Sequence, residues 1–281
     1  MSRSRGGGGE LRGVRVLVTG ATSGIGRAMA EALVAAGATV AITGREVGRA
    51  RRVAEEMPEG SGQAIGIAMD VRDDHQVERG VREVMERLGG LEALVNNAGL
   101  GMRTVNPQFL TMRQPFWKVD RKAFREVIAT NLTGYFLVAG EVVPHLLRAG
   151  RGRIVNISMN HSTMRRPGFV PYGPSRAGAE SLSQIMAADL AGTGVSVNML
   201  LPGGATETGM IPEDVPLEVR SNLLSPRVMA APICWLCSAA AEGVTGERIV
   251  AIDFDRWLSL RTGPELGGAV QPPGERSIPE R

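Results

Sequence analysis

Residues 14–26 read VRVLVTGATSGIG, and this stretch decides the fold. Residues 14–19 form a short apolar run typical of a buried strand, and residues 24–36 continue with the apolar spacing of a helix. The glycines between them allow a sharp turn and a close approach to a pyrophosphate, which then lies on the helix N-terminus. A lone glycine pattern is weak evidence, but the strand–turn–helix context favours nucleotide binding over a merely structural turn.

The rest of the chain repeats the alternation of strand and helix. Seven strands that alternate with helices predict an α/β fold, a Rossmann-type doubly wound parallel sheet in a single domain. We expect that domain over residues 13–260, with flexible tails at 1–12 and 261–281. The predicted strands are 14–19, 39–43, 64–69, 92–95, 153–157, 195–200 and 248–252, and the predicted helices are 24–36, 46–57, 73–88, 121–147, 172–190 and 226–239.

Composition excludes several classes of function. Hydrophobic residues make up 43% and charged residues 22%, which is ordinary for a globular protein, and the net charge is only +3. The 32 basic residues are scattered rather than arranged in a stripe with aromatics, so we expect no nucleic-acid partner. No run of 18 apolar residues is present, and the N-terminal stretch lacks the apolar core of a signal peptide. We therefore expect no membrane span and a cytoplasmic protein.

The two cysteines, Cys234 and Cys237, form a CxxC within an apolar helical stretch. No second CxxC exists, and the chain has three histidines. We therefore interpret the cysteines as core residues rather than as half of a zinc site, and expect no metal. A reducing compartment fits this interpretation.

The glycine turn resembles the TGxxxGxG of the short-chain dehydrogenase/reductase family, and matching motifs follow in order over about residues 13–253. The resemblance implies a cofactor site built from the turn, an adenine contact, the NNAG segment after the fourth strand and the nicotinamide side after the sixth. Its expected residues are Gly20, Thr22, Ser23, Gly24, Ile25 and Gly26 in the turn, Asp70 and Val71 at the adenine, Asn97, Ala98 and Gly99 in NNAG, and Pro202, Gly203 and Ala205 beside the nicotinamide.

Which cofactor binds is indicated by the end of the second strand. An acidic residue there would bind the ribose 2′-hydroxyl of NAD and repel a 2′-phosphate. The chain instead reads Thr43-Gly44-Arg45, and an arginine pairs a phosphate through a charge-assisted fork. The alternative is that Arg45 is a solvated arginine at a helix start. The sequence favours NADP(H) over NAD(H).

The family resemblance implies that Tyr172 is the general acid/base, with Asn131 supporting a proton path. The family has a lysine four residues after the tyrosine, on the same helix face, and here Arg176 stands in that place. Its fixed charge can stabilise a tyrosinate and its N–H groups can hold the ribose. The exchange is nevertheless not conservative, because the guanidinium is planar and does not release a proton.

A second departure lies 13 residues before Tyr172, where the family has a serine that orients the substrate carbonyl. Met159 stands there, and a thioether donates no hydrogen bond. Ser158 comes one residue earlier and is kept with His161 in the expected catalytic group, although it should point to the opposite face if the strand continues. Asn160, His161 and Ser162 are the candidate substitutes, and histidine is the residue type most often used for acid–base work.

Two functions remain open. The first is an NADP(H)-dependent reductase or dehydrogenase acting with Tyr172 on an apolar small molecule. The second keeps the nucleotide without redox work, as a cyclase, an isomerase or a nucleotide-binding regulator.

The substrate side is predicted from two segments. The stretch 100–118 is long for the family and holds Phe109, Met112, Phe116 and Trp117, which either wall a pocket or pack on a partner subunit. Residues 203–212 resemble the mobile lid, in which Thr206 or Thr208 could reach the carboxamide. The helices over 121–147 and 172–190 resemble the family's subunit interface and imply a homodimer or homotetramer.

Overall fold

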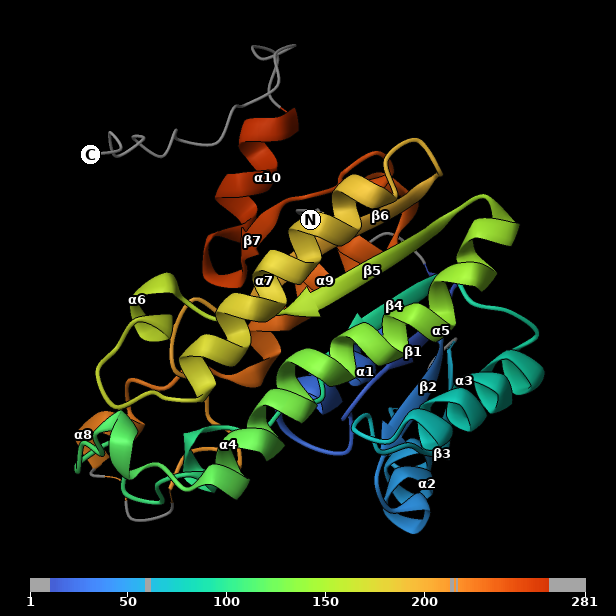
Figure 1. Ribbon diagram of the computed structural model, residues 1–281. Coiled ribbons are helices and arrows are strands. Elements are labelled where there is room, and N and C mark those ends of the chain that lie inside the picture. Colours follow the sequence, from blue (N-terminus) through green and yellow to red (C-terminus); the bar gives the residue numbers. More distant parts are fainter. Residues whose placement is uncertain (1–10, 59–61, 213–214, 216, 263–281) are drawn as a thin grey trace, which may run out of the picture.

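The computed structural model describes residues 11–58, 62–212, 215 and 217–262. Seven parallel strands form one sheet in the order β3-β2-β1-β4-β5-β6-β7 (Figure 1). The strands are β1 Arg15–Val18, β2 Thr39–Gly44, β3 Gln63–Ala68, β4 Ala93–Asn96, β5 Gly152–Ile157, β6 Val195–Leu201 and β7 Arg248–Val250.

Helices cover both faces of the sheet, as the doubly wound prediction requires. On one face lie α3, α5 and α7, and on the other α1 and α9 (Figure 1). The helices are α1 Gly24–Ala35, α2 Val47–Glu55, α3 Asp74–Leu88, α4 Arg121–Ile128, α5 Gly134–Ala149, α6 His161–Met164, α7 Tyr172–Asp189, α8 Leu217–Arg220, α9 Ala230–Cys237 and α10 Phe254–Thr262.

Strand β1 shows why the strands lack polar alternation. Val16 and Val18 join the core under α1 and α9, while Leu17 between them joins the core under α3 and α5. All three side chains are fully buried. A central strand of a doubly wound sheet faces apolar layers on both sides, so a continuous apolar run is the expected pattern.

The packed domain begins earlier than the sequence suggested. Leu11, which we placed in a flexible tail, is fully buried, and its N–H donates to the carbonyl of Ala36 at 2.8 Å. At the other end α10 continues through Thr262 and crosses the expected boundary at 260. Residues 1–10 and 263–281 of the predicted tails lie outside the described residues.

The helix predicted over 121–147 is divided in two. A π-helical turn, Ala129–Thr133, separates α4 from α5. Such turns are rare and are frequently found at functional sites. Within the described residues, the combined segment Arg121–Ala149 is long and apolar enough to cross a membrane by length and composition alone. Its buried side chains, Val138, Val142 and Leu146, pack in the core with α3 and the sheet, as in a core helix.

The two cysteines lie in α9 and are buried free thiols. Burial raises the pKa of Cys234 to about 11 and that of Cys237 to about 12. Both thiols are therefore protonated at neutral pH, which confirms their interpretation as core residues. Among the described residues no group of three or more metal-ligating side chains is found.

Candidate active site

The phosphate turn follows β1 and is braced by the segment after β4. The Thr19 hydroxyl accepts the backbone N–H groups of Asn97 and Ala98 at 2.9 and 3.0 Å. The Asn97 side-chain amide donates back to the carbonyls of Thr19 and Gly20 at 2.9 and 3.1 Å. Gly20 has a left-handed φ of 61°, and a Cβ on it would lie 2.7 Å from Cα of Ala98. Only glycine fits there, because the two segments approach so closely.

The turn leads directly into the N-terminus of α1, which is open to an anion. Ser23 is the N-cap residue, yet its side chain makes no capping hydrogen bond to the helix. The first N–H groups of a helix lack intrahelical acceptors, and the helix dipole favours negative charge there. Thr208 of the predicted lid lies close, since a Cβ on Gly24 would meet its methyl group at 3.2 Å. Shape and donors both fit a pyrophosphate.

The edge formed by β2 and β3 carries the expected adenine-side residues. Arg45 follows β2 directly and is exposed. Asp70 forms an ion pair with Arg72 at 2.6 Å. The Arg72 hydrogen bond lowers the pKa of Asp70, and the nearby charge of Arg45 adds to this effect. Val71, expected at the adenine, is 5% exposed and its side chain belongs to the core.

Three of the expected catalytic residues come together where α7 begins. Tyr172 is the first residue of α7, and Arg176 lies one turn later. The Cζ atom of Arg176 is 5.6 Å from the centre of the Tyr172 ring. Asn131, in the π-helical turn, exchanges hydrogen bonds of 2.7 and 2.9 Å with the backbone of Leu100. Its amide also donates to Oγ of Ser175 at 3.1 Å, which ties the π-helical turn to α7.

Arg176 is held in a way that sequence reasoning missed. Its Nη1 donates to Oη of Tyr135 at 2.6 Å and to the carbonyl of Ile157 at 2.8 Å. Tyr135 is only 1% exposed, and burial raises its pKa although Arg176 opposes this effect. Burial alone would lower the pKa of Arg176. The interactions of the guanidinium with Tyr135 and Tyr172 outweigh this effect, and the pKa of Arg176 is raised. Arg176 therefore remains a cation.

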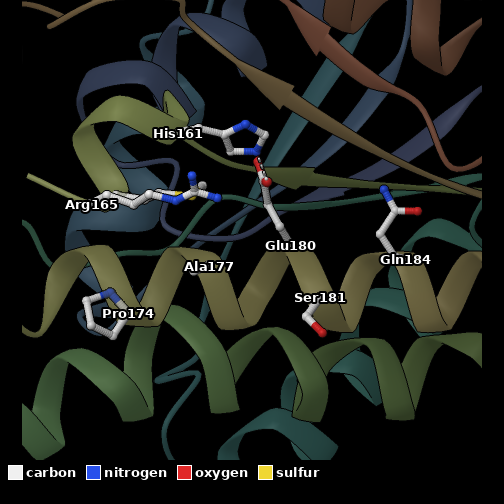
Figure 2. A pocket seen from close by; sticks show the side chains of 8 residues that line it. His161, Arg165, Pro174, Ala177, Glu180, Ser181 and Gln184 are labelled. Atoms are coloured by element: carbon white, nitrogen blue, oxygen red, sulfur yellow. Dashed lines mark hydrogen bonds and ion pairs between the residues drawn. The ribbon is translucent and has the colours of Figure 1, made fainter. Parts of the chain in front are cut away.

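Ser158 and His161 are directed elsewhere. Ser158 Oγ donates to Oε1 of Glu180, and His161 Nε2 lies 2.9 Å from Oε2 of the same carboxylate. His161 is exposed and lines a cavity of about 480 Å³ beside α6 and α7, to which Tyr172 does not contribute (Figure 2). We expected both residues in the catalytic group, but the structure gives them this separate carboxylate as partner.

Glu180 fixes the loop that carries Met159. Arg248 donates to Oε1 of Glu180 at 2.8 Å and to the carbonyl of Met159 at 2.7 Å. Asn160 donates its side-chain amide to the carbonyl of Gly203 at 2.8 Å, which connects this loop to the nicotinamide side. Asn160, one of the three proposed substitutes for the missing serine, thus contacts the predicted nicotinamide-side segment through an amide that is already engaged.

The nicotinamide-side segment leaves β6 in a tight turn. Gly203 has a left-handed φ of 100°, and the Pro202 carbonyl accepts the N–H of Ile252 at 3.3 Å. Ala205 accepts the N–H of Leu224 at 2.8 Å, so the lid segment is attached to the chain that follows it. Thr206 is buried and its hydroxyl donates to the carbonyl of Gly204 at 3.3 Å.

The long segment 100–118 separates into an inner and an outer part. Phe109 packs edge-on against Phe169 with ring centres 5.9 Å apart, and both line a cavity of about 260 Å³. Met112, Phe116 and Trp117 face solvent with exposures of 59, 67 and 71%. Of the two alternatives for this stretch, a pocket wall fits Phe109, while the exposure of Met112, Phe116 and Trp117 leaves contact with a partner subunit open for them.

Comparisons with known proteins find related sequences over most of the chain. The family model for short chain dehydrogenases matches residues 14–216. A 3-oxoacyl-[acyl-carrier-protein] reductase from Aquifex aeolicus is 35% identical over 85% of this chain and 96% of that relative. A gluconate 5-dehydrogenase from Gluconobacter oxydans is 33% identical over 93% of each chain.

The fold is likewise similar to solved structures. A 3-ketoacyl-(acyl-carrier-protein) reductase from Brucella melitensis, solved as a complex with NADH, superposes with a TM-score of 0.74 at 28% identity. The match covers 85% of this chain and 97% of that structure. The family model, over residues 14–216, spans the phosphate turn and the helix that begins with Tyr172.

Proposed function

The chain belongs to the short-chain dehydrogenase family, and from this premise we propose that it is an NADP(H)-dependent oxidoreductase with Tyr172 as acid–base group. It would reduce a carbonyl group or oxidise the corresponding alcohol. The observation that carries the proposal is the buried Arg176 guanidinium beside the Tyr172 ring, 5.6 Å from Cζ to the ring centre. A fixed cation beside a phenol stabilises the tyrosinate that proton donation leaves behind.

The residues around the phosphate turn would hold the cofactor. Gly20 to Gly26 and the α1 N-terminus receive the pyrophosphate, and Asn97 to Gly99 line the adjoining edge of the sheet. The bound cofactor supplies the hydride, which is chemistry that no side chain in this site provides.

Proton transfer falls to Tyr172. Its Oη would donate a proton to the carbonyl oxygen during reduction, and would accept one from the alcohol in the reverse direction. Arg176 supports the anionic form of Tyr172, and Asn131 fixes the segment at Leu100 and the start of α7. Because Met159 offers no hydrogen-bond donor, Tyr172 is left as the principal group that orients the carbonyl.

Arg45 supports the preference for NADP(H). It is exposed where the ribose of the adenosine would lie, and its charge reaches Asp70. Because Arg72 pairs with Asp70 at 2.6 Å, the negative charge nearby is neutralised and a 2′-phosphate meets less repulsion.

The substrate and the assembly follow from the surroundings of the site. The proposal of an apolar substrate rests on Phe109 and Phe169, which line a cavity next to the segment 100–118 that Arg113 and Arg166 also line. Phe136 on α5 and Ile185 on α7 are 55 and 56% exposed, and helices with such side chains fit a homodimer or homotetramer interface.

The buried free thiols are consistent with a cytoplasmic protein.

The second candidate function is a non-redox one, favoured by Met159. A site that no longer orients a carbonyl could serve a cyclase, an isomerase or a nucleotide-dependent regulator. The two functions differ in whether Tyr172 is required for oxidation of NADPH by a carbonyl compound.

The test is the Tyr172→Phe variant, assayed with NADPH and a panel of ketones and aldehydes. Loss of the acid–base group should lower kcat by about 10² to 10⁴-fold. NADPH affinity should change little, since the phosphate turn is untouched. Full turnover in Tyr172→Phe would eliminate the tyrosine-centred mechanism.

A further inference from the structure

Arg176 is a buried cation whose hydrogen bonds go to neutral oxygens. The residue is 3% exposed, and its Nη1 donates to Oη of Tyr135 and to the carbonyl of Ile157 at 2.6 and 2.8 Å. Its Nε is buried without a partner among the described residues. Burial of a charge is unfavourable unless hydrogen bonds replace those to water, so each remaining acceptor is important.

Tyr135 completes a closed arrangement around Nη1. Its Oη accepts from Arg176 and donates to the same Ile157 carbonyl at 3.2 Å. Its ring centre lies 5.5 Å from Cζ of Arg176, while the Tyr172 ring lies at 5.6 Å. The guanidinium is therefore near two aromatic rings and is fixed at one nitrogen by two oxygens. An aliphatic residue at position 135 would leave Nη1 with the Ile157 carbonyl alone.

The opposite edge of the guanidinium faces the cofactor segment. A Cβ on Gly99 would collide with Nη2 of Arg176, so the glycine leaves space for this nitrogen. The same Cβ would lie 3.3 Å from Oδ1 of Asn131. Nη1 is thus used for anchoring, and Nη2 points to the segment where the proposed function places the cofactor.

We propose that Tyr135 is the positioning residue that enables an arginine to act at position 176. Tyr135 holds Nη1, so that the rest of the guanidinium lies beside the Tyr172 ring and faces the cofactor segment. This inference rests on the proposed function. A lysine ammonium is a compact point charge on a flexible stem, whereas the planar guanidinium must be fixed in orientation. The site is therefore rebuilt around arginine, and Tyr135 and Arg176 act as a pair.

A double-mutant cycle tests the pair. The four proteins are the unmodified chain, Tyr135→Phe, Arg176→Lys and the double variant. For each we would measure kcat and KM with a carbonyl compound, the NADPH dissociation constant from cofactor fluorescence, and the unfolding temperature. Thr130→Val is the matched control, because Thr130 is also buried, on the π-helical turn, and its hydroxyl donates to the Glu126 carbonyl at 2.8 Å rather than to Arg176.

The expected result is strong coupling between the two positions. Tyr135→Phe should lower kcat and NADPH affinity about fivefold or more when Arg176 is present, and less than about twofold in the Arg176→Lys background. Arg176→Lys alone should lower turnover. The control Thr130→Val should lower the unfolding temperature without this coupling.

Equal losses from Tyr135→Phe in both backgrounds would overturn the proposal and leave Tyr135 with a purely structural role. Absence of turnover in the unmodified chain would instead count against the proposed function. In that case the NADPH dissociation constants of the four proteins still decide the positioning role: coupled affinities support it, and additive affinities overturn it.

Discussion

Replacement of Arg45 by alanine should weaken NADPH binding and leave NADH binding unchanged. Arg45 is exposed after β2, so its pairing with a 2′-phosphate is screened by solvent and salt. A charge-assisted fork to phosphate is nevertheless stronger than an ordinary surface pair, and we take about 1.5 kcal/mol for its loss. At 1.4 kcal/mol for each factor of ten, the NADPH dissociation constant should rise about tenfold.

The assay is a fluorescence titration of each variant with NADPH and NADH at two ionic strengths. The Arg45→Asp variant adds repulsion and should bind NADH more tightly than NADPH. Arg87→Ala is a matched control, because Arg87 lies in the last turn of α3, paired with Glu83 at 3.1 Å. Helix α3 runs back from the carboxyl edge of the sheet, so this control removes a positive charge far from the site. Unchanged NADPH affinity in Arg45→Ala would refute the assignment of the 2′-phosphate to Arg45.

Three further changes give separate outcomes. Gly20→Ala should lower the free energy of unfolding by about 1–3 kcal/mol, seen as a lower unfolding temperature. The added methyl would lie 2.7 Å from the Cα of Ala98, and the φ of 61° disfavours a side chain. An unchanged unfolding temperature would show that the turn relaxes freely. Met159→Ser should raise kcat/KM about tenfold or more by supplying the missing donor, and a fall would mean that the site no longer orients its substrate this way. Cys234 and Cys237 should resist a thiol-directed reagent in the folded protein until the pH approaches about 11, the value to which burial raises the pKa of Cys234. Modification of either thiol at neutral pH would contradict their core position.

The fold was predictable because its signals are local. Each strand is a short apolar run bounded by a turn, and the seven predicted runs agree with the observed strands to within one or two residues. The exceptions depend on tertiary packing. The seventh strand was predicted to end at residue 252, but β7 ends at Val250 because Ala251–Asp253 form a 3₁₀ turn before α10. The π-helical turn at Ala129–Thr133 leaves no mark in the apolar spacing of the helix.

The site was predictable where a motif defines it, and not where partners come from distant elements. The family resemblance implied the places of Tyr172, Arg176 and Asn131, and the structure brings these residues together. Tyr135 reads as one more apolar position of a long helix, and its contact with Arg176 spans 41 residues of sequence. His161 was expected at the site, but its partner Glu180 lies 19 residues away on a helix face that sequence reasoning did not consider.

The most direct test of the central claim is a titration of the purified protein with NADPH and NADH, followed by a carbonyl panel monitored at the nicotinamide absorbance. The account predicts that NADPH binds more tightly than NADH and is oxidised when a ketone or aldehyde is present. Tight NADPH binding without turnover on any carbonyl would contradict the oxidoreductase assignment and favour the non-redox function. Binding of neither cofactor would contradict the account at its starting point, the turn between β1 and α1.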